Sequence, residues 1–222
     1  MFPSRCSRRS WRRTVVESME QRWLELWNRL GARGDPHYWF KDLAGRYGDP
    51  DRRYHTLRFH IQPCLIFLEA HPALARDPNA VGFALWYHDA MDDENQSAAY
   101  AVQVTIEIGL PEAFSQAVAD LILATKHTSE VPIKPDGRLI ADIDLMILGQ
   151  PEDVFDDYEE RIREEYSWVP ERTFRNARAA ILRPMLDRPF IYATSYFRSR
   201  YEAQARRNVT KSLGLLESTR TP

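Results

Sequence analysis

The chain has 222 residues, of which 44% are hydrophobic and 12% aromatic, enough to bury a sizeable core. Its formal net charge of −2 excludes a bulk cationic surface of the kind that binds nucleic acid or anionic membranes without specificity. Two cysteines, Cys6 and Cys64, form no disulfide or zinc-ribbon spacing, and no apolar stretch approaches membrane-spanning length. These features predict a cytoplasmic protein with no membrane partner.

The first 18 residues differ from the rest in being strongly basic. Their arginines are Arg5, Arg8, Arg9, Arg12 and Arg13, and Glu17 is the only acid. Ser7–Trp11 is similar to a twin-arginine leader, but no hydrophobic region follows, which argues against export. We therefore expect a disordered basic tail over 1–18, a single domain over 19–215 and a C-terminal tail over 216–222.

Helical periodicity dominates the chain from Met19 onward. Trp23, Leu26, Trp27 and Leu30 form a first apolar stripe that ends at Gly31. Further helices are predicted over 38–47, 55–69, 80–88, 97–108, 111–126, 139–148, 151–166, 170–186 and 189–213. Proline stands near the predicted start of four of them, where its missing N–H costs nothing: Pro111, Pro151, Pro170 and Pro189. Since alternating strand patterns are scarce, the sequence predicts an all-α bundle.

An apolar run over 81–87 ends at His88-Asp89, with Asp92, Asp93 and Glu94 just beyond. Imidazole and carboxylate are both metal ligands. Adjacent residues on a helix point about 100° apart, so both can face one ion only near a helix end. The pair therefore predicts a metal site.

Other acid or imidazole groups lie at predicted helix ends or core faces: Tyr54-His55 with His60, His127, and Asp142 with Asp144. Asp144 is the most informative, because residues that favour burial surround it over 139–141 and 145–148. A buried carboxylate needs a compensating partner, and a divalent cation is a strong one.

The order His, His-Asp, Asp resembles the HD superfamily of metal-dependent phosphohydrolases, and looks closest to its bacterial branch of predicted metal-dependent HD phosphohydrolases. The matching blocks are Tyr54–Leu57 with His60-Ile61, Ala84–Asp89, Asp142–Leu145 with Leu148-Gly149, and Glu202–Asn208. The resemblance extends over almost the whole chain from Met19. It implies an all-α HD-domain helical bundle.

The resemblance also implies roles for individual residues. The metal ligands would be His60, His88, Asp89 and Asp144, holding a divalent ion such as Mn, Mg, Fe, Ni, Co or Zn. Asp142 would support the ligands or replace one of them. Asp89 would also bridge the metal and the nucleophile.

The resemblance implies further roles for residues outside this set of four ligands. By analogy with cyclic-nucleotide phosphodiesterases, His55 is a candidate general acid. Glu94, or Asp92 or Asp93 beside it, would orient or deprotonate the attacking water. His127 would bind the substrate phosphate or a second metal.

Two departures from the family pattern bear on these roles. The family places the first two histidines four residues apart, whereas five separate His55 from His60, as if Phe59 were inserted. Five residues miss the original face of an α-helix by about 140°. Either His55 precedes the helix, or the turn contains a π-bulge, or one histidine is lost to the site. In addition, the loop between Asp89 and Ser97-Ala98 is shorter than in relatives.

The implied function is hydrolysis of a phosphate ester, of a nucleotide or another small phosphorylated metabolite, by a metal-activated water. Two alternatives stay open: a non-hydrolytic metal-containing binding or signalling module, and a di-iron oxygenase. The expected partner is a small phosphorylated substrate, with no strong nucleic-acid signal. Small all-α enzymes with exposed aromatic stripes often dimerise, so a homodimer is also open.

Overall fold

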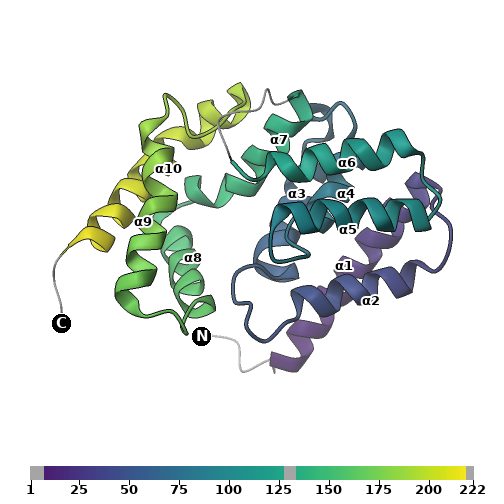
Figure 1. Ribbon diagram of the computed structural model, residues 1–222, viewed down its shortest axis with the longest axis horizontal. Coiled ribbons are helices and arrows are strands. Elements are labelled where there is room, and N and C mark those ends of the chain that lie inside the picture. The colour runs from purple at the N-terminus through teal and green to yellow at the C-terminus, as the bar shows by residue number, and fades with distance from the viewer. Residues whose placement is uncertain (1–7, 128–133, 219–222) are drawn as a thin grey trace, which may run out of the picture. The chain divides into compact units, whose positions relative to one another are not determined.

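The computed structural model describes residues 8–127 and 134–218, which form ten α-helices and no strand (Figure 1). The all-α prediction is confirmed. The chain divides into two compact units, Met1–Lys126 and His127–Pro222. In the described ranges no helix has the length and apolar character needed to cross a membrane.

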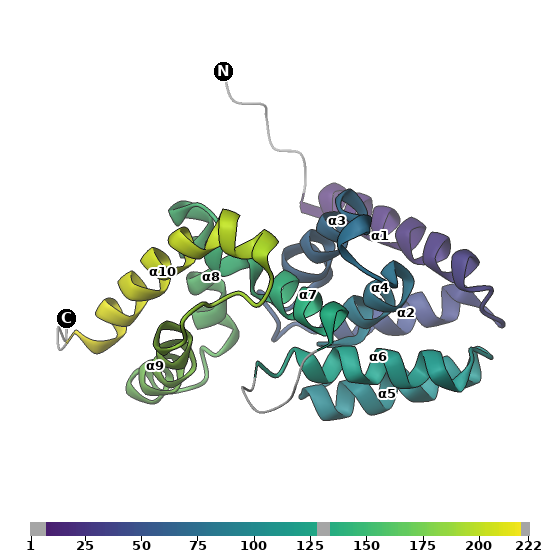
Figure 2. The same ribbon diagram turned by 90° about the horizontal axis from the view of Figure 1, so that it is seen from above.

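The first unit contains six α-helices with two short helical turns between them. These are α1 (Arg8–Leu30), α2 (Pro36–Tyr47), the π-helical turn η1 (Leu57–Ile61), α3 (Gln62–Ala70), the 3-10 turn η2 (Pro72–Leu74), α4 (Pro78–Tyr87), α5 (Glu94–Glu107) and α6 (Glu112–Ala124). Helices α5 and α6 pack side by side as a hairpin (Figure 2).

The N-terminal helix begins earlier than the sequence indicated. Helix α1 starts at Arg8, so residues 8–18, expected to be a disordered tail, are helical. Arginine has a high helix propensity, and the helix is already anchored by its buried stripe at Met19, Trp23 and Leu26. The part of the predicted tail before Arg8 lies outside the described residues.

Helix α4 is the centre of the first unit. Every residue from Ala80 to Tyr87 is buried, as expected of a helix that is apolar on all sides. It contacts α1, α3, α5 and α6. Trp23 of α1 packs against the rings of Phe83, Trp86 and Tyr87 at centroid distances of 5.9, 5.6 and 6.1 Å. The end of α4, where His88 follows, is therefore held on several sides.

The second unit contains the remaining helices: α7 (Pro135–Asp144), the 3-10 turn η3 (Leu145–Gly149), α8 (Glu152–Glu165), α9 (Glu171–Asp187) and α10 (Ser195–Glu217). The predicted start of the last helix at Pro189 was wrong. The backbone N–H groups of Ile191 and Tyr192 donate to Glu202, and this segment is irregular rather than helical. Helix α10 instead begins after Thr194, whose side chain caps the N–H of Phe197.

The block Glu202–Asn208, which resembles a family block, stabilises the second unit. Asn208 is buried and donates from Nδ2 to the carbonyls of Leu148 and Gln150, at 2.8 and 2.9 Å. Arg206 pairs with Glu202 at 2.7 Å and donates to carbonyls before α10. These contacts give the block a structural role.

Gly149→Ala should destabilise the second unit by about 1–3 kcal/mol, the usual range for overpacking. A Cβ added at Gly149 would lie 2.6 Å from the Tyr201 Cβ and 3.0 Å from the Tyr201 carbonyl oxygen, and a backbone atom cannot move aside cheaply. The matched control is Gly214→Ala, where nothing lies within 4 Å of the new Cβ. It should leave stability unchanged or raise it, since alanine favours helix. Urea unfolding of both variants tests this, and equal midpoints would contradict the close packing.

Candidate metal centre

The imidazole of His88 is positioned by the end of α4. His88 is the C-cap residue, and its backbone N–H donates to the Ala84 carbonyl at 2.9 Å. Its ring Nδ1 lies 3.0 Å from the Leu85 carbonyl oxygen. A carbonyl only accepts, so Nδ1 carries a proton, and in the neutral imidazole Nε2 then carries the lone pair. A hydrogen bond of this kind orients a histidine for metal binding.

His60 lies on the π-helical turn η1, and its side chain is buried. Thr56 caps this turn by accepting from the Phe59 N–H at 3.2 Å. His55 therefore precedes the helical segment, and the segment itself is π-helical. Both of the structural explanations offered for the five-residue spacing are therefore correct. The Nδ1 of His60 lies 3.3 Å from the Tyr54 hydroxyl, which leaves Nε2 pointing toward His88.

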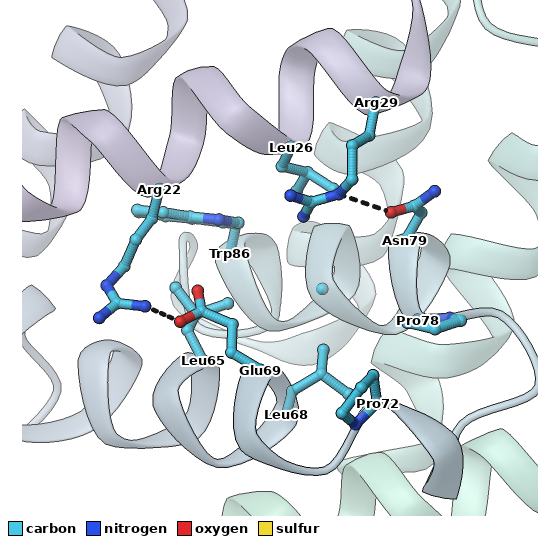
Figure 3. A pocket seen from close by; sticks show the side chains of 11 residues that line it. Arg22, Leu26, Arg29, Leu65, Leu68, Glu69, Pro72, Pro78, Asn79 and Trp86 are labelled. Atoms are coloured by element: carbon cyan, nitrogen blue, oxygen red, sulfur yellow. Dashed lines mark hydrogen bonds and ion pairs between the residues drawn. The ribbon is translucent and has the colours of Figure 1, made fainter.

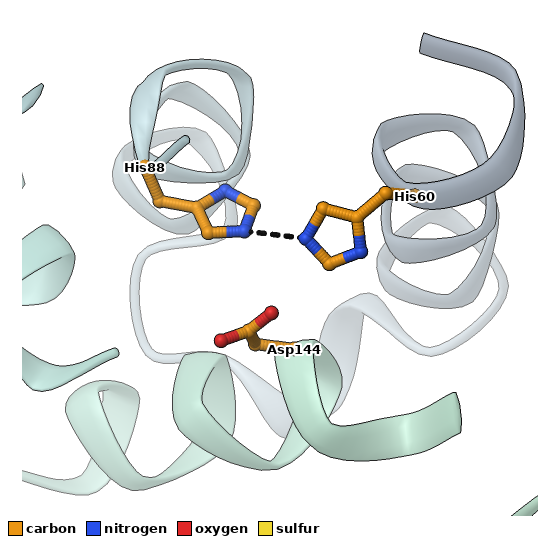
Figure 4. Close-up of side chains that lie close together, drawn as sticks. All are labelled: His60, His88 and Asp144. Atoms are coloured by element: carbon orange, nitrogen blue, oxygen red, sulfur yellow. Dashed lines mark hydrogen bonds between the residues drawn. The ribbon is translucent and has the colours of Figure 1, made fainter. Parts of the chain in front are cut away.

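Three ligand atoms of the first unit converge on one point. Figure 4 shows the rings of His60 and His88 facing each other through Nε2, with 2.9 Å between the two nitrogens. The Oδ2 of Asp89 lies 3.0 Å from the His60 Nε2 and 3.4 Å from the His88 Nε2. The described residues thus contain a His/His/Asp cluster in which both histidines are buried and the aspartate is half-buried.

The spacing of these atoms fits a metal ion. Nitrogen and oxygen ligands lie about 2.0–2.2 Å from zinc and about 2.0–2.1 Å from magnesium. Two ligands at such distances are about 3.0 Å apart at a right angle and about 3.4 Å apart at a tetrahedral angle. The triangle of 2.9, 3.0 and 3.4 Å matches this range, so His60, His88 and Asp89 could hold one divalent ion.

The surroundings of Asp89 favour its ionised form. Burial alone would raise the pKa of this carboxyl. The charge of His88 and the hydrogen bond and charge of His60 outweigh burial and hold the pKa well below its usual range. An ionised carboxylate between two imidazoles is the charge state that metal binding requires.

Arg52 ties the candidate general acid to this cluster. Its Nη1 donates to the backbone carbonyls of His55 and Asp89, at 3.3 and 2.7 Å. The ring of His55 lies edge-on to that of His60, with centroids 5.5 Å apart. The structure therefore brings His55 next to the cluster.

The acidic residues after Asp89 belong to the start of α5. Asp93 caps this helix by accepting from the Gln96 N–H at 2.9 Å. Glu94 is the first helical residue and is partly buried. Its role in activating water stays a prediction.

The other predicted site residues belong to the second unit. Asp144 ends α7, and its Oδ2 lies 2.9 Å from the His127 Nε2. His127 has a φ of 56° and is the one non-glycine residue with positive φ in the described ranges. A strained backbone of this kind persists only where surrounding contacts hold it. One such contact is the hydrogen bond from Arg188 to the His127 carbonyl.

Asp142 is buried, and both of its carboxylate oxygens accept hydrogen bonds from the residues just before α10. The donors are the Ala193 N–H at 2.7 Å, and the N–H and hydroxyl of Thr194 at 2.8 and 2.6 Å. Burial raises the pKa of this carboxyl despite these hydrogen bonds. In its own unit Asp142 fixes the start of α10.

Comparison of the chain with known protein families, curated proteins and solved structures gives no match. Over its described residues the molecule is all-helical and contains a His/His/Asp cluster with two buried histidines. Its resemblance to the HD superfamily rests on the sequence blocks alone.

Two groups that shape the site had no distinct signal in the sequence. The Leu85 carbonyl is a backbone atom, and Arg52 acts on backbone carbonyls as well. Tyr54 belongs to the sequence block Tyr54–Leu57 that resembles the family, but its contact with His60 depends on the path of the chain through η1.

Tyr54→Phe should weaken metal binding by about 10- to 100-fold, the usual effect of losing a hydrogen bond to a histidine ligand. The substitution removes only the hydroxyl beside the His60 Nδ1 and keeps the buried ring. Competition titration against a chelating dye would measure the change. Unchanged affinity would mean that the hydroxyl does not orient His60.

Proposed function

We propose that the protein is a metal-dependent phosphohydrolase of the HD superfamily, which hydrolyses a phosphate ester of a nucleotide or another small phosphorylated metabolite. The observation that carries the proposal is the convergence of His60 Nε2, His88 Nε2 and Asp89 Oδ2 within 3.4 Å of one another. A histidine, then a His-Asp pair, is the order that the resemblance implies for the ligands.

The proposal includes Asp144 as a fourth ligand. Asp144 offers a carboxylate oxygen, the same class of ligand that Asp89 provides. Supporting this role, its position at the end of α7 corresponds to the last aspartate of the family order. His127 would then hold the Asp144 carboxylate in place through its Nε2.

When bound, a divalent ion would lower the pKa of a water molecule and withdraw charge from a phosphoryl oxygen. The residues of the chain would supply the rest of the chemistry. His55, placed beside His60, would donate a proton to the leaving oxygen. Arg52 would hold the backbone of His55 close to that of Asp89 by donating hydrogen bonds to both carbonyls. Glu94 is the proposed group that orients the attacking water.

Metal analysis and a phosphatase assay test the proposal. The full-length protein, purified without chelator, would be analysed for bound metals and assayed with p-nitrophenyl phosphate and a panel of nucleotides and sugar phosphates. We expect retained divalent metal, hydrolysis of at least one phosphate ester, and loss of activity with EDTA that added metal restores. A protein that retains no metal would contradict the proposal.

The same measurements separate the two alternative functions. Retained metal with phosphate-ester binding but no turnover would indicate a binding or signalling module. Two irons per chain would indicate a di-iron oxygenase. Either result would contradict the proposed hydrolase function.

A further inference from the structure

Arg52 is anchored between the candidate general acid and the metal cluster of the first unit. One of its nitrogens, Nη1, donates to the carbonyls of both His55 and Asp89, at 3.3 and 2.7 Å. The guanidinium also lies over the ring of Tyr47, with its Cζ 5.4 Å from the ring centroid. Because the guanidinium is planar and rigid, these contacts hold its remaining donors in place.

The other edge of this guanidinium, formed by Nε and Nη2, is available to a ligand. Neither atom has a hydrogen-bond partner within residues 8–127 and 134–218. Neither atom is buried, because the buried side-chain nitrogens and oxygens without a partner in those ranges belong to Arg22 and Tyr87. Arg52 as a whole is half-buried. Two parallel donors on one edge are the form in which arginine binds phosphates.

The charge of Arg52 is not neutralised by a neighbouring side chain. Its two hydrogen bonds go to uncharged carbonyls, and no carboxylate of the described residues forms an ion pair with it. Figure 3 shows two arginines of α1 that do have side-chain partners. Arg22 pairs with Glu69, and Arg29 donates from Nε to Asn79. Arg52 therefore offers an anion both a positive charge and two donors.

We infer that, given the proposed hydrolase function, Arg52 binds the phosphoryl group of the substrate through Nε and Nη2, and that this group is terminal, with three unsubstituted oxygens. A divalent ion at the cluster would take one phosphoryl oxygen, and a guanidinium edge takes two more. A phosphomonoester, or the end of a nucleotide's phosphate chain, has three such oxygens. A phosphodiester has only two.

The anchoring of Arg52 suits this role. The reacting phosphoryl group has to reach both Asp89, beside the nucleophile, and His55, which donates to the leaving oxygen. Arg52 is bonded to the backbone of both residues, which brings its guanidinium close to that group. In the reaction the oxygen of water bonds to phosphorus, the ester P–O bond breaks, and the leaving oxygen takes a proton from His55. Arg52 forms no covalent bond, and it binds the phosphate product in the same way.

Titration calorimetry with the full-length, metal-containing protein tests the inference with two ligands that are not hydrolysed. Phenylphosphonate presents three unsubstituted oxygens, and its monomethyl ester presents two. We expect the wild type to bind phenylphosphonate at least about tenfold more tightly, because the ester loses a charge-assisted hydrogen bond. Arg52→Gln should remove most of this preference. Arg52→Lys should also reduce it, since lysine keeps the charge without the paired donors.

Arg58→Gln is the matched control. Arg58 is exposed on η1, and its guanidinium lies over the ring of Phe59, with 5.0 Å between Cζ and the ring centroid. This variant should keep the wild-type preference. Metal content and thermal unfolding of each protein separate phosphate binding from a structural role, because we expect the Arg52 variants to fold and to retain the metal while the preference falls.

Several results would overturn the inference. Equal affinity of the wild type for the two phosphonates would do so whether or not the variants fold, and so would an Arg52→Lys protein that keeps the full preference. Faster hydrolysis of bis(p-nitrophenyl) phosphate than of p-nitrophenyl phosphate by the wild type would overturn it too, while the proposed hydrolase function would stand. A wild type that retains no metal would instead contradict that function itself.

Discussion

Asp89→Ala should abolish both metal retention and phosphatase activity while leaving the helical content largely intact. The substitution removes the only anionic ligand of the first-unit cluster, whose Oδ2 lies 3.0 and 3.4 Å from the two Nε2 atoms. Losing a residue that merely supports a ligand costs about 10- to 100-fold in metal affinity, so losing a ligand should cost at least about 100-fold. The helices should survive, because the aromatic packing around α4 does not involve Asp89.

Metal content after gel filtration, hydrolysis of p-nitrophenyl phosphate and far-ultraviolet circular dichroism would check this result together. Asp153→Ala is the matched control, since it removes an exposed aspartate from the first turn of α8. It should retain the metal and the activity. If Asp89→Ala turned over substrate as fast as the wild type, the proposed site would be wrong.

Asp142→Ala should lower the free energy of unfolding by about 3 kcal/mol, since hydrogen bonds to charged groups are worth about 1.5–3 kcal/mol each and are not additive. The variant leaves three donors of the half-buried residues Ala193 and Thr194 without their acceptor. For a chain of this length the melting temperature should fall by about 6–12 °C. Differential scanning calorimetry would measure the loss.

A substitution two residues further on distinguishes stability from metal binding. Asp144→Asn keeps the size of the side chain but removes its charge, so we expect weaker metal binding and activity with little change in stability. Asp142→Ala should show the reverse pattern at a temperature where it is folded. If Asp144→Asn retained full metal affinity and activity, Asp144 would not be the fourth ligand, although the cluster of the first unit could still stand.

Much of the secondary structure was predictable from local patterns. The apolar stripe of Trp23, Leu26 and Trp27 marked α1, and the run before His88 marked a buried helix that ends at the imidazole. The structure places α4 over Pro78–Tyr87 against the predicted 80–88. These predictions succeeded because helical periodicity and burial on all sides are properties of short stretches of sequence.

The start of α10 shows where local patterns fail. Pro189 is a typical first residue of a helix, yet the helix begins at Ser195. The reason lies far away in the sequence, because Glu202 and Asp142 bind the backbone N–H groups of 191–194. Asp142 is 51 residues from Ala193, a separation at which no periodicity can signal a contact.

Local sequence patterns were enough to predict a helical chain, a buried α4, and an imidazole and a carboxylate at the end of that helix. The position of the His60 ring beside them depends on the folded chain, through the π-helical turn η1 and the Tyr54 hydroxyl. It also decided that Asp142 serves the start of α10. The physical reason is that helix formation depends on neighbours in the chain, whereas a ligand cluster depends on side chains that packing brings together from distant positions.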